Sequence, residues 1–217
     1  MKKKGKFIVF EGIDGAGKTT QTNLLIQHLK KNRRKVVFIH FPQYETKSGG
    51  LIENYLQGHY GKVGPYQASV FYAADRFDGG FRIKNWLKGG YIVVADRYLA
   101  SNIGHQGGKI RSVKAREKFF HWLYDFEYKL FKIPKPTLSF LLKMPPRTAQ
   151  RLTKKHSKKL DIHEKDILHL QHADQAYQHA AEVFPRDFQI IDSMSGKTLR
   201  SPKDIHKEVW GKVQNLL

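Results

Sequence analysis

The sequence predicts an α/β protein built on a five-stranded parallel sheet with helices on both faces. Two observations lead to this fold class. Short apolar runs alternate along the chain with longer stretches in which apolar residues recur at helical spacing. The apolar runs are also nearly uninterrupted, which is typical of parallel strands buried on both faces. Because ligands of such sheets bind at the carboxyl ends of the strands, we expect the functional residues directly after strands.

The expected strands are short runs rich in Val, Ile, Leu and Phe. They lie at residues 7–10, 35–41, 91–95, 138–142 and 188–191. Turn residues come before two of them, with Gly89-Gly90 ahead of the third strand and Pro134-Lys135-Pro136 ahead of the fourth. These breaks set the start of each of the two strands.

The expected helices follow the strands and carry apolar residues three and four positions apart. In the first, residues 20–31, these are Leu24, Leu25 and Leu29. The others are expected at 48–56, 66–87, 115–131, 147–155, 162–182 and 201–217. The helix at 115–131 is rich in aromatic residues, which suit either the core or an interface between subunits.

Length and composition limit the possible classes of protein. The chain has 217 residues, 40% of them apolar, which suits one domain over residues 1–217. It has no cysteine, so disulfides and thiolate metal sites are excluded. The apolar run at 7–10 is followed by Glu11 and is too short for a signal peptide, and no stretch is long enough to span a bilayer. We therefore expect a cytoplasmic protein with no membrane partner.

The formal net charge of +20 is high for a chain of this size. A basic cleft attracts nucleotides and nucleic acids alike. A solvated lysine-rich surface would give the same net charge without any function. Charge alone therefore does not choose among these interpretations.

A phosphate-binding motif follows the first expected strand. Residues 12–19 fit the pattern G-x-x-x-x-G-K-[ST] between a strand and a helix, which is the context that the motif requires. This predicts the P-loop NTPase fold and ATP as a ligand. Lys18 would bridge the β- and γ-phosphates, and the Thr19 hydroxyl would bind Mg²⁺. The expected ATP-binding residues of this loop are Gly12, Asp14, Gly15, Ala16, Gly17, Lys18, Thr19 and Thr20.

A second pair of polar residues, Asp96 and Arg97, ends the third expected strand. A carboxylate at this edge of the sheet is suited to Mg²⁺. An arginine beside it can stabilise the charge on a phosphoryl group as it is transferred. No guanine-reading Asn-Lys-x-Asp is present, which argues against a GTPase.

From residue 7 to about residue 193 the chain resembles the thymidylate kinase family. The matching segments are 10–20, 41–44, 72–76, 96–102, Gln106 and 161–164. The resemblance implies transfer of a phosphoryl group from Mg·ATP to dTMP, and a homodimer. The substrate-binding residues that it implies are Asp14, Phe41, Tyr44, Tyr72, Arg76, Arg97, Ser101, Asn102, His105 and Gln106.

The resemblance also implies roles within this set. Tyr72 would stack on thymine and Arg76 would bond a base oxygen; positions i and i+4 share one helix face. Asp14 would lie near the acceptor phosphate and sugar. His105 departs from the family, which usually has an aromatic residue there that shields the sugar 2′-position, so exclusion of ribonucleotides is less firmly implied.

A basic lid is expected at about residues 147–161. The family places a catalytic arginine either in the P-loop or in the lid, and Gly15 stands at the P-loop position. Arg151 is therefore the expected catalytic arginine and a further ATP contact, with Lys18, Arg97 and Asp14 completing the catalytic set. A lysine of the segment 154–159 would assist it, and Asp161 and Glu164 match the acidic pair that closes the lid.

Three alternatives remain open from sequence. A deoxynucleoside kinase would need a carboxylate base near the sugar 5′-hydroxyl, a role available to Glu11. A nucleic-acid-binding P-loop protein would account for the charge, although no zinc site, helix-turn-helix pattern or RNA-binding aromatic signature supports it. A degenerate kinase kept as a scaffold would account for the lysine-rich lid. Nucleic acid is therefore not the expected partner.

Overall fold

The computed structural model describes residues 5–156 and 166–217. Its centre is a parallel sheet of β1 (Lys6–Glu11), β2 (Val36–His40), β3 (Ile92–Asp96), β4 (Leu138–Lys143) and β5 (Gln189–Asp192). The strand order is β2-β3-β1-β4-β5. The predicted five-stranded parallel sheet is thus confirmed. After β1 the chain passes to the edge strand β2, and it then returns to β3, which lies beside β1. The carboxyl ends of β1 and β3 therefore form the topological switch point, which is where ligands of such sheets bind.

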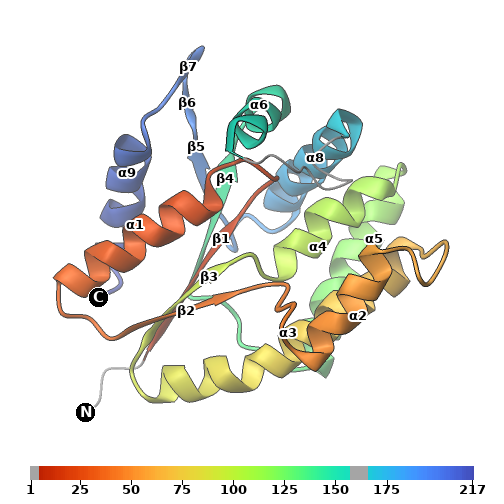
Figure 1. The fold of residues 1–217 in the computed structure, drawn as a ribbon, viewed down its shortest axis with the longest axis horizontal. Helices are drawn as coiled ribbons and strands as arrows, with labels where there is room; N and C mark the ends of the chain where they lie inside the picture. The colour runs from red at the N-terminus through yellow and green to blue at the C-terminus, as the bar shows by residue number, and fades with distance from the viewer. Residues whose placement is uncertain (1–4, 157–165) are drawn as a thin grey trace.

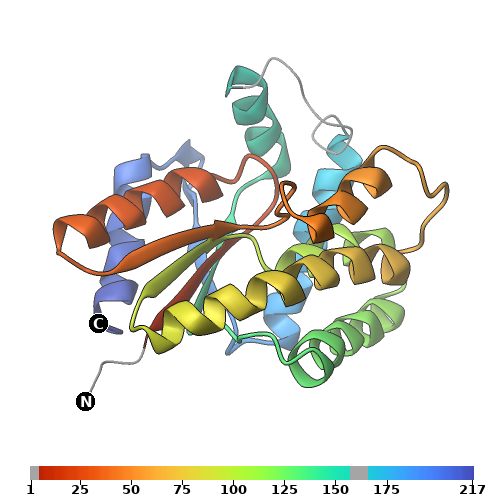
Figure 2. The same cartoon turned by 60° about the horizontal axis from the view of Figure 1, so that its bottom comes forward.

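Helices cover both faces of the sheet, as Figure 1 shows. One face carries α1 (Lys18–Lys31) and α9 (Pro202–Gln214). The other carries α3 (Pro65–Lys88), α4 (Leu99–His105), α5 (Val113–Tyr124) and α8 (Ile167–Val183). α2 (Lys47–Leu56) packs on α3, and α6 (Pro146–His156) follows β4 and stands at the carboxyl edge (Figure 2). A 3₁₀ turn (Gly107–Lys109), a π-helical turn (Asp125–Leu130) and a hairpin of β6 (Met194–Ser195) and β7 (Thr198–Leu199) complete the described elements.

The core explains why these segments are strands. Every residue from Phe7 to Phe10 is at most 1% exposed, and Phe10 stacks on Phe140 of the neighbouring strand. The edge strand β2 is covered less completely, and its Phe38 is 45% exposed. The aromatic residues of the expected helix at 115–131 suited either the core or an interface; Phe119 and Phe120 are fully buried and belong to the core.

Side-chain caps fix several helix starts. The hydroxyl of Thr46 accepts from the N–H of Gly49 at α2, and that of Ser112 accepts from Ala115 at α5. Asp166 caps α8, and Ser201 caps α9 with a proline next in sequence. Short polar residues satisfy N–H groups that have no partner within the helix.

The expected helix at 115–131 is present to Leu130, but its second half is not α-helical. It is α-helical to Tyr124 and then forms a π-helical turn, Asp125–Leu130, which carries the buried Glu127. Helix α4 and the β6–β7 hairpin were not predicted, because seven-residue and two-residue elements carry too little periodicity. Of the expected helix at 162–182, residues 162–165 lie outside the described part. Within the described ranges, no helix is both long and apolar enough to cross a bilayer; the cytoplasmic location stays a prediction.

Candidate active site

The phosphate-binding loop joins β1 to α1. Gly12, Gly15 and Gly17 have φ values of +136°, +80° and +91°, a region that L side chains rarely adopt. Lys18 Nζ donates to the carbonyl oxygens of Gly12 at 3.0 Å and Ile13 at 2.8 Å, which places the ammonium inside the loop. Burial and the nearby Arg97 lower the pKa of Lys18 to about 8. The loop, the ammonium and the first N–H groups of α1 together form a site suited to phosphates.

Helix α6 rests directly on this loop at Gly15. A Cβ at residue 15 would lie 2.4 Å from the carbonyl oxygen of Ala149 and 2.5 Å from Thr153 Oγ1. Both contacts are shorter than real Cβ atoms allow, and the first is to backbone. The arrangement of α6 therefore excludes a P-loop arginine at this position.

We expect Gly15→Ala to lower the free energy of unfolding more than Gly17→Ala does. Both variants place an alanine at positive φ, but a Cβ at Gly17 meets nothing within 4 Å, whereas one at Gly15 meets α6. Overpacking costs about 1–3 kcal/mol, which is the expected gap between the two variants. Urea unfolding without nucleotide measures it, and equal losses would contradict the packing of α6 on the loop.

The two predicted metal ligands lie together. Thr19 Oγ1 donates to Asp96 Oδ2 at 2.7 Å, which joins the start of α1 to the end of β3. A hydroxyl and a carboxylate oxygen are ligands that Mg²⁺ accepts beside phosphate oxygens and water. The donor set therefore fits the cation that the P-loop motif implies.

Arg97 follows β3 with a φ of +68°, and its N–H donates to the carbonyl oxygen of Phe10 at 2.9 Å. Its Nη2 forms an ion pair with Asp14, and its Nη1 donates to Ser101 Oγ at 3.2 Å and His105 Nε2 at 3.1 Å. Burial would raise the pKa of Asp14, but the charge of Arg97 above all holds it well below its usual range. Asp14 is therefore an anion held against a cation at the centre of the site.

The predicted substrate-binding residues surround one cavity of about 130 Å³. Every one of them lines it: Asp14, Phe41, Tyr44, Tyr72, Arg76, Arg97, Ser101, Asn102, His105 and Gln106. Four further lining residues were not predicted, namely Pro42, Leu56, Tyr98 and His169. We call this space the acceptor cavity.

Arg76 is held in the wall of the acceptor cavity by a buried carboxylate. Its Nε and Nη2 donate to the two oxygens of Glu127, both at 2.6 Å, and the side chains are 2% and 0% exposed. Its Nη1 lies 3.4 Å from the carbonyl oxygen of Tyr98. The ion pair orients the guanidinium, and the bond from Arg76 to a base oxygen stays a prediction.

A larger groove of about 820 Å³ runs along the P-loop. It is lined by Asp14 and all residues from Gly15 to Thr20, and by Asp96, Leu152, Thr153 and Arg200 among others. Gly12 is not among the lining residues; its carbonyl oxygen accepts from Lys18 Nζ at 3.0 Å and lies 3.5 Å from Arg97 Nη1. Arg151 is exposed on α6 and is not among the lining residues, so its catalytic and ATP-binding roles stay predictions. Residues 157–161 of the expected lid, and Glu164, lie outside the described part of the chain.

The groove and the acceptor cavity adjoin. Five residues line both: Asp14, Phe41, Pro42, Tyr44 and Arg97. A triphosphate on the P-loop and a second phosphate in the acceptor cavity would therefore meet beside Arg97.

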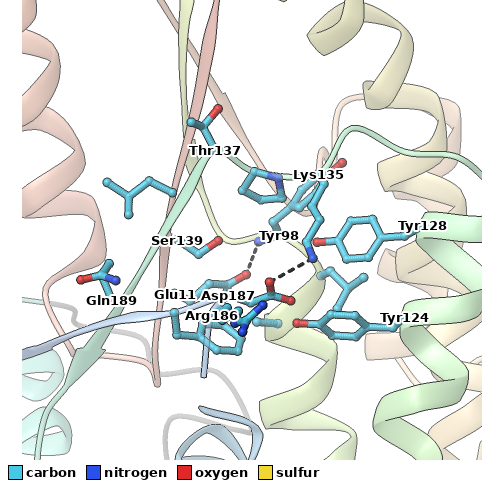
Figure 3. A pocket seen from close by; sticks show the side chains of 15 residues that line it. Glu11, Tyr98, Tyr124, Tyr128, Lys135, Thr137, Ser139, Arg186, Asp187 and Gln189 are labelled. Carbon is cyan, nitrogen blue, oxygen red and sulfur yellow. Dashed lines mark hydrogen bonds and ion pairs between the residues drawn. The ribbon is translucent and has the colours of Figure 1, made fainter. Parts of the chain in front are cut away.

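Glu11 lies behind this junction rather than in it. Its carboxylate accepts from the N–H of Tyr98 at 2.8 Å and from Ser101 Oγ at 2.7 Å. It does not line the acceptor cavity but borders a smaller space of about 70 Å³ behind it. Figure 3 shows that space, where Lys135 contacts Asp187 at 2.9 Å. A general base for a sugar hydroxyl would have to face the acceptor cavity. The position of Glu11 therefore does not support its role as the base of a deoxynucleoside kinase.

Glu11→Gln is expected to change how stability depends on pH. Burial raises the pKa of Glu11 above 4.5. The folded protein therefore binds this proton more tightly than the unfolded chain, and ionisation of Glu11 costs stability as the pH rises from 4.5. Gln does not ionise. The free energy of unfolding of the Glu11→Gln variant, relative to that of the parent, should therefore increase as the pH rises from 4.5 to 7.5, as measured by urea unfolding. A constant difference would show that Glu11 is not penalised by burial.

Three functional candidates were missed by sequence reasoning. Glu127 was hidden in an aromatic stretch, although a single acidic residue on the buried side of a helix signals a buried partner. His169 and Arg200 carried no local signal. Arg200 lines the groove while donating to Glu208 at 2.8 Å.

Comparisons with known proteins agree with this geometry. Residues 10–208 match the family model described as thymidylate kinase. Thymidylate kinase of Plasmodium falciparum is 36% identical over 149 residues, which make up 69% of this chain and 66% of that protein. Thymidylate kinase of Halothermothrix orenii is 30% identical over 219 residues, or 99% of each chain.

The fold is also similar to a solved structure. Thymidylate kinase from Candida albicans matches with a TM-score of 0.78 at 21% identity, over 98% of this chain and 92% of that one. At this identity the likeness concerns the fold alone. The family model, however, spans most of the sequence, and the relative from Halothermothrix orenii is covered from end to end. The chain therefore belongs to the thymidylate kinase family.

Proposed function

We propose that this chain transfers the γ-phosphoryl group of Mg·ATP to dTMP, giving dTDP and ADP. One observation carries the proposal: the acceptor cavity, with Tyr72 and Arg76 in its wall, opens into the P-loop groove at Asp14 and Arg97. An aromatic ring beside a fixed guanidinium suits a pyrimidine base with carbonyl oxygens. The family relationship supports the same acceptor.

The proposed mechanism relies on positioning and charge. An oxygen of the acceptor phosphate attacks the γ-phosphorus in line, and the bond from that phosphorus to the β-phosphate oxygen breaks, so ADP leaves. Lys18 binds the β- and γ-phosphates, and Arg97 holds the phosphate in transfer. Thr19 and Asp96 would hold Mg²⁺, which when bound neutralises phosphate charge. The acceptor oxygen is already ionised near neutral pH, so the chain needs no general base.

The acceptor is identified by an assay of ADP release with Mg·ATP and dTMP, dUMP, dCMP, dAMP or thymidine. We expect the highest kcat/KM with dTMP, and loss of turnover in Lys18→Ala. Turnover with thymidine but not dTMP would move the chain to the deoxynucleoside kinases. Folded protein that binds ATP but turns over none of these acceptors would favour the scaffold or nucleic-acid alternatives.

We propose that the lid cation comes from α6 or the segment after it. The steric block at Gly15 supports this, because it removes the P-loop alternative. Arg147, Arg151 and Lys154 are exposed on α6. Arg151 remains the candidate with a planar fork that can bind phosphate oxygens in pairs.

We also propose a homodimer formed through α3. Its outer face carries an apolar stripe of Tyr66, Val70, Phe77 and Phe81, each 40–54% exposed. These positions fall on one side of a helix, and a second copy of the stripe would cover them.

A charge in this stripe is expected to separate the subunits. Phe81→Asp would place a carboxylate where the partner's apolar side chains pack, so the mass in sedimentation or light scattering should fall from dimer to monomer. Leu168→Asp is the matched control, because Leu168 is 60% exposed on a different helix. A dimeric Phe81→Asp protein, or a monomeric parent, would contradict the proposed interface.

A further inference from the structure

Two histidines, His105 and His169, form a series of hydrogen bonds that begins at Arg97. His105 ends α4, and His169 lies in the first turn of α8. Arg97 Nη1 is 3.1 Å from His105 Nε2, and His105 Nδ1 is 3.1 Å from His169 Nε2. The two imidazole rings lie within 22° of parallel, and both line the acceptor cavity.

The chemistry of these groups fixes the direction of each hydrogen bond. A guanidinium has only donors, so His105 Nε2 must accept and carries no proton. The proton of a neutral His105 is then on Nδ1, and it donates to His169 Nε2. Arg97 therefore donates to His105, and His105 donates to His169. The second hydrogen bond keeps the proton of His105 on Nδ1, so that Nε2 can accept from Arg97.

The surroundings favour the neutral ring that this arrangement needs. Burial above all, and after it Arg97, His169 and Lys18, hold the pKa of His105 well below its ordinary value, despite the opposing charge of Asp14. Tyr177 packs edge-on against the same ring at 6.2 Å between centroids. His105 is thus a neutral acceptor in a fixed orientation.

The contact with His105 determines which N–H groups of Arg97 are left for a phosphate. Nη1 donates to Ser101 and His105 and lies 3.5 Å from the carbonyl oxygen of Gly12, and Nη2 donates to Asp14. Among the described residues, Nε–H has no hydrogen-bond partner. The guanidinium is therefore held on one side by Ser101, His105 and Asp14, and Nε–H with the second N–H of Nη2 are available to an anion.

We propose that His105 and His169 are positioning residues for phosphoryl transfer: His169 fixes the tautomer of His105, which in turn holds the fork of Arg97 toward the acceptor phosphate. The rate consequence rests on the proposed function, whereas the tautomer of His105 does not. Because His169 belongs to α8, the orientation of Arg97 depends on the helix that follows the expected lid.

The test compares two replacements of similar size. His169→Gln places an amide oxygen near the position of Nε2 and keeps an acceptor for His105, whereas His169→Leu removes it. We expect kcat for dTMP to fall about 10-fold in His169→Leu, with little change in the KM for ATP, and to recover in His169→Gln. In an Arg97→Ala background, His169→Leu should cause no further loss, because it acts through Arg97.

A spectroscopic readout separates this proposal from the proposed function. Nitrogen chemical shifts of His105 should show a proton on Nδ1 in the parent and in His169→Gln, and a mixture of tautomers in His169→Leu, with folding checked by thermal unfolding. This holds even if dTMP is not the acceptor. An Nδ1 proton unchanged in His169→Leu, equal kcat in the Gln and Leu variants, or additive losses with Arg97→Ala would overturn the proposal.

Discussion

Replacing Arg97 with alanine is expected to lower kcat for dTMP by about 100-fold or more, with ATP affinity nearly unchanged. Arg97 lines both the groove and the acceptor cavity, whereas the triphosphate also has Lys18 and the N–H groups of the P-loop. Alanine keeps the Cβ, so the strain of a φ of +68° is the same in parent and variant. The change in rate therefore reports the loss of the guanidinium, including its ion pair with Asp14, and not a change in backbone strain.

Two further variants sharpen this prediction. Arg97→Lys should recover only part of the rate, because an ammonium supplies the charge but not the two-pronged contact. Arg116→Ala is the matched control, since Arg116 on α5 donates to the carbonyl oxygen of Ile110, which lies before that helix, and lines neither cavity. Steady-state kinetics and nucleotide titration measure both quantities. A loss of less than tenfold in Arg97→Ala would remove Arg97 from the catalytic set.

The second large effect concerns stability. Glu127→Ala is expected to lower the free energy of unfolding by about 3–5 kcal/mol, because it leaves the charge of Arg76 buried without its partner. Arg76→Ala should cost a similar amount for the converse reason. The double variant Arg76→Met with Glu127→Leu should cost less than either single change, since no buried charge remains.

The same π-helical turn supplies a control for this experiment. Asp125 and Lys129 form an ion pair in which the side chains are 60% and 78% exposed. Asp125→Ala should therefore change stability by about 0–1 kcal/mol, because solvent screens an exposed pair. Urea unfolding at neutral pH gives all four values. Similar decreases in the free energy of unfolding for Asp125→Ala and Glu127→Ala would contradict the claim that the buried ion pair contributes more than the exposed one.

The fold was predictable because its signals are local. An uninterrupted apolar strand followed by a glycine-rich phosphate loop can be seen in twenty residues, and the Asp96-Arg97 pair marks the next strand end. The wall of the acceptor cavity could be predicted because the family resemblance supplied it residue by residue, from Tyr72 to Gln106.

What could not be predicted depends on tertiary packing. Glu127 meets Arg76 from 51 positions away, and only because a π-helical turn directs it inward. His169 meets His105 across 64 positions, from a helix whose start is set by the cap at Asp166. No period or motif in the sequence records either contact. The position of Arg151 likewise depends on how α6 rests on the P-loop.

The close seating of α6 on Gly15 also has an evolutionary meaning. In this protein a codon change from glycine to arginine at residue 15 would meet the backbone of Ala149 before it could offer a charge to ATP. An arginine at residue 15 would therefore require α6 to move away from the loop, so these two segments constrain each other's sequence.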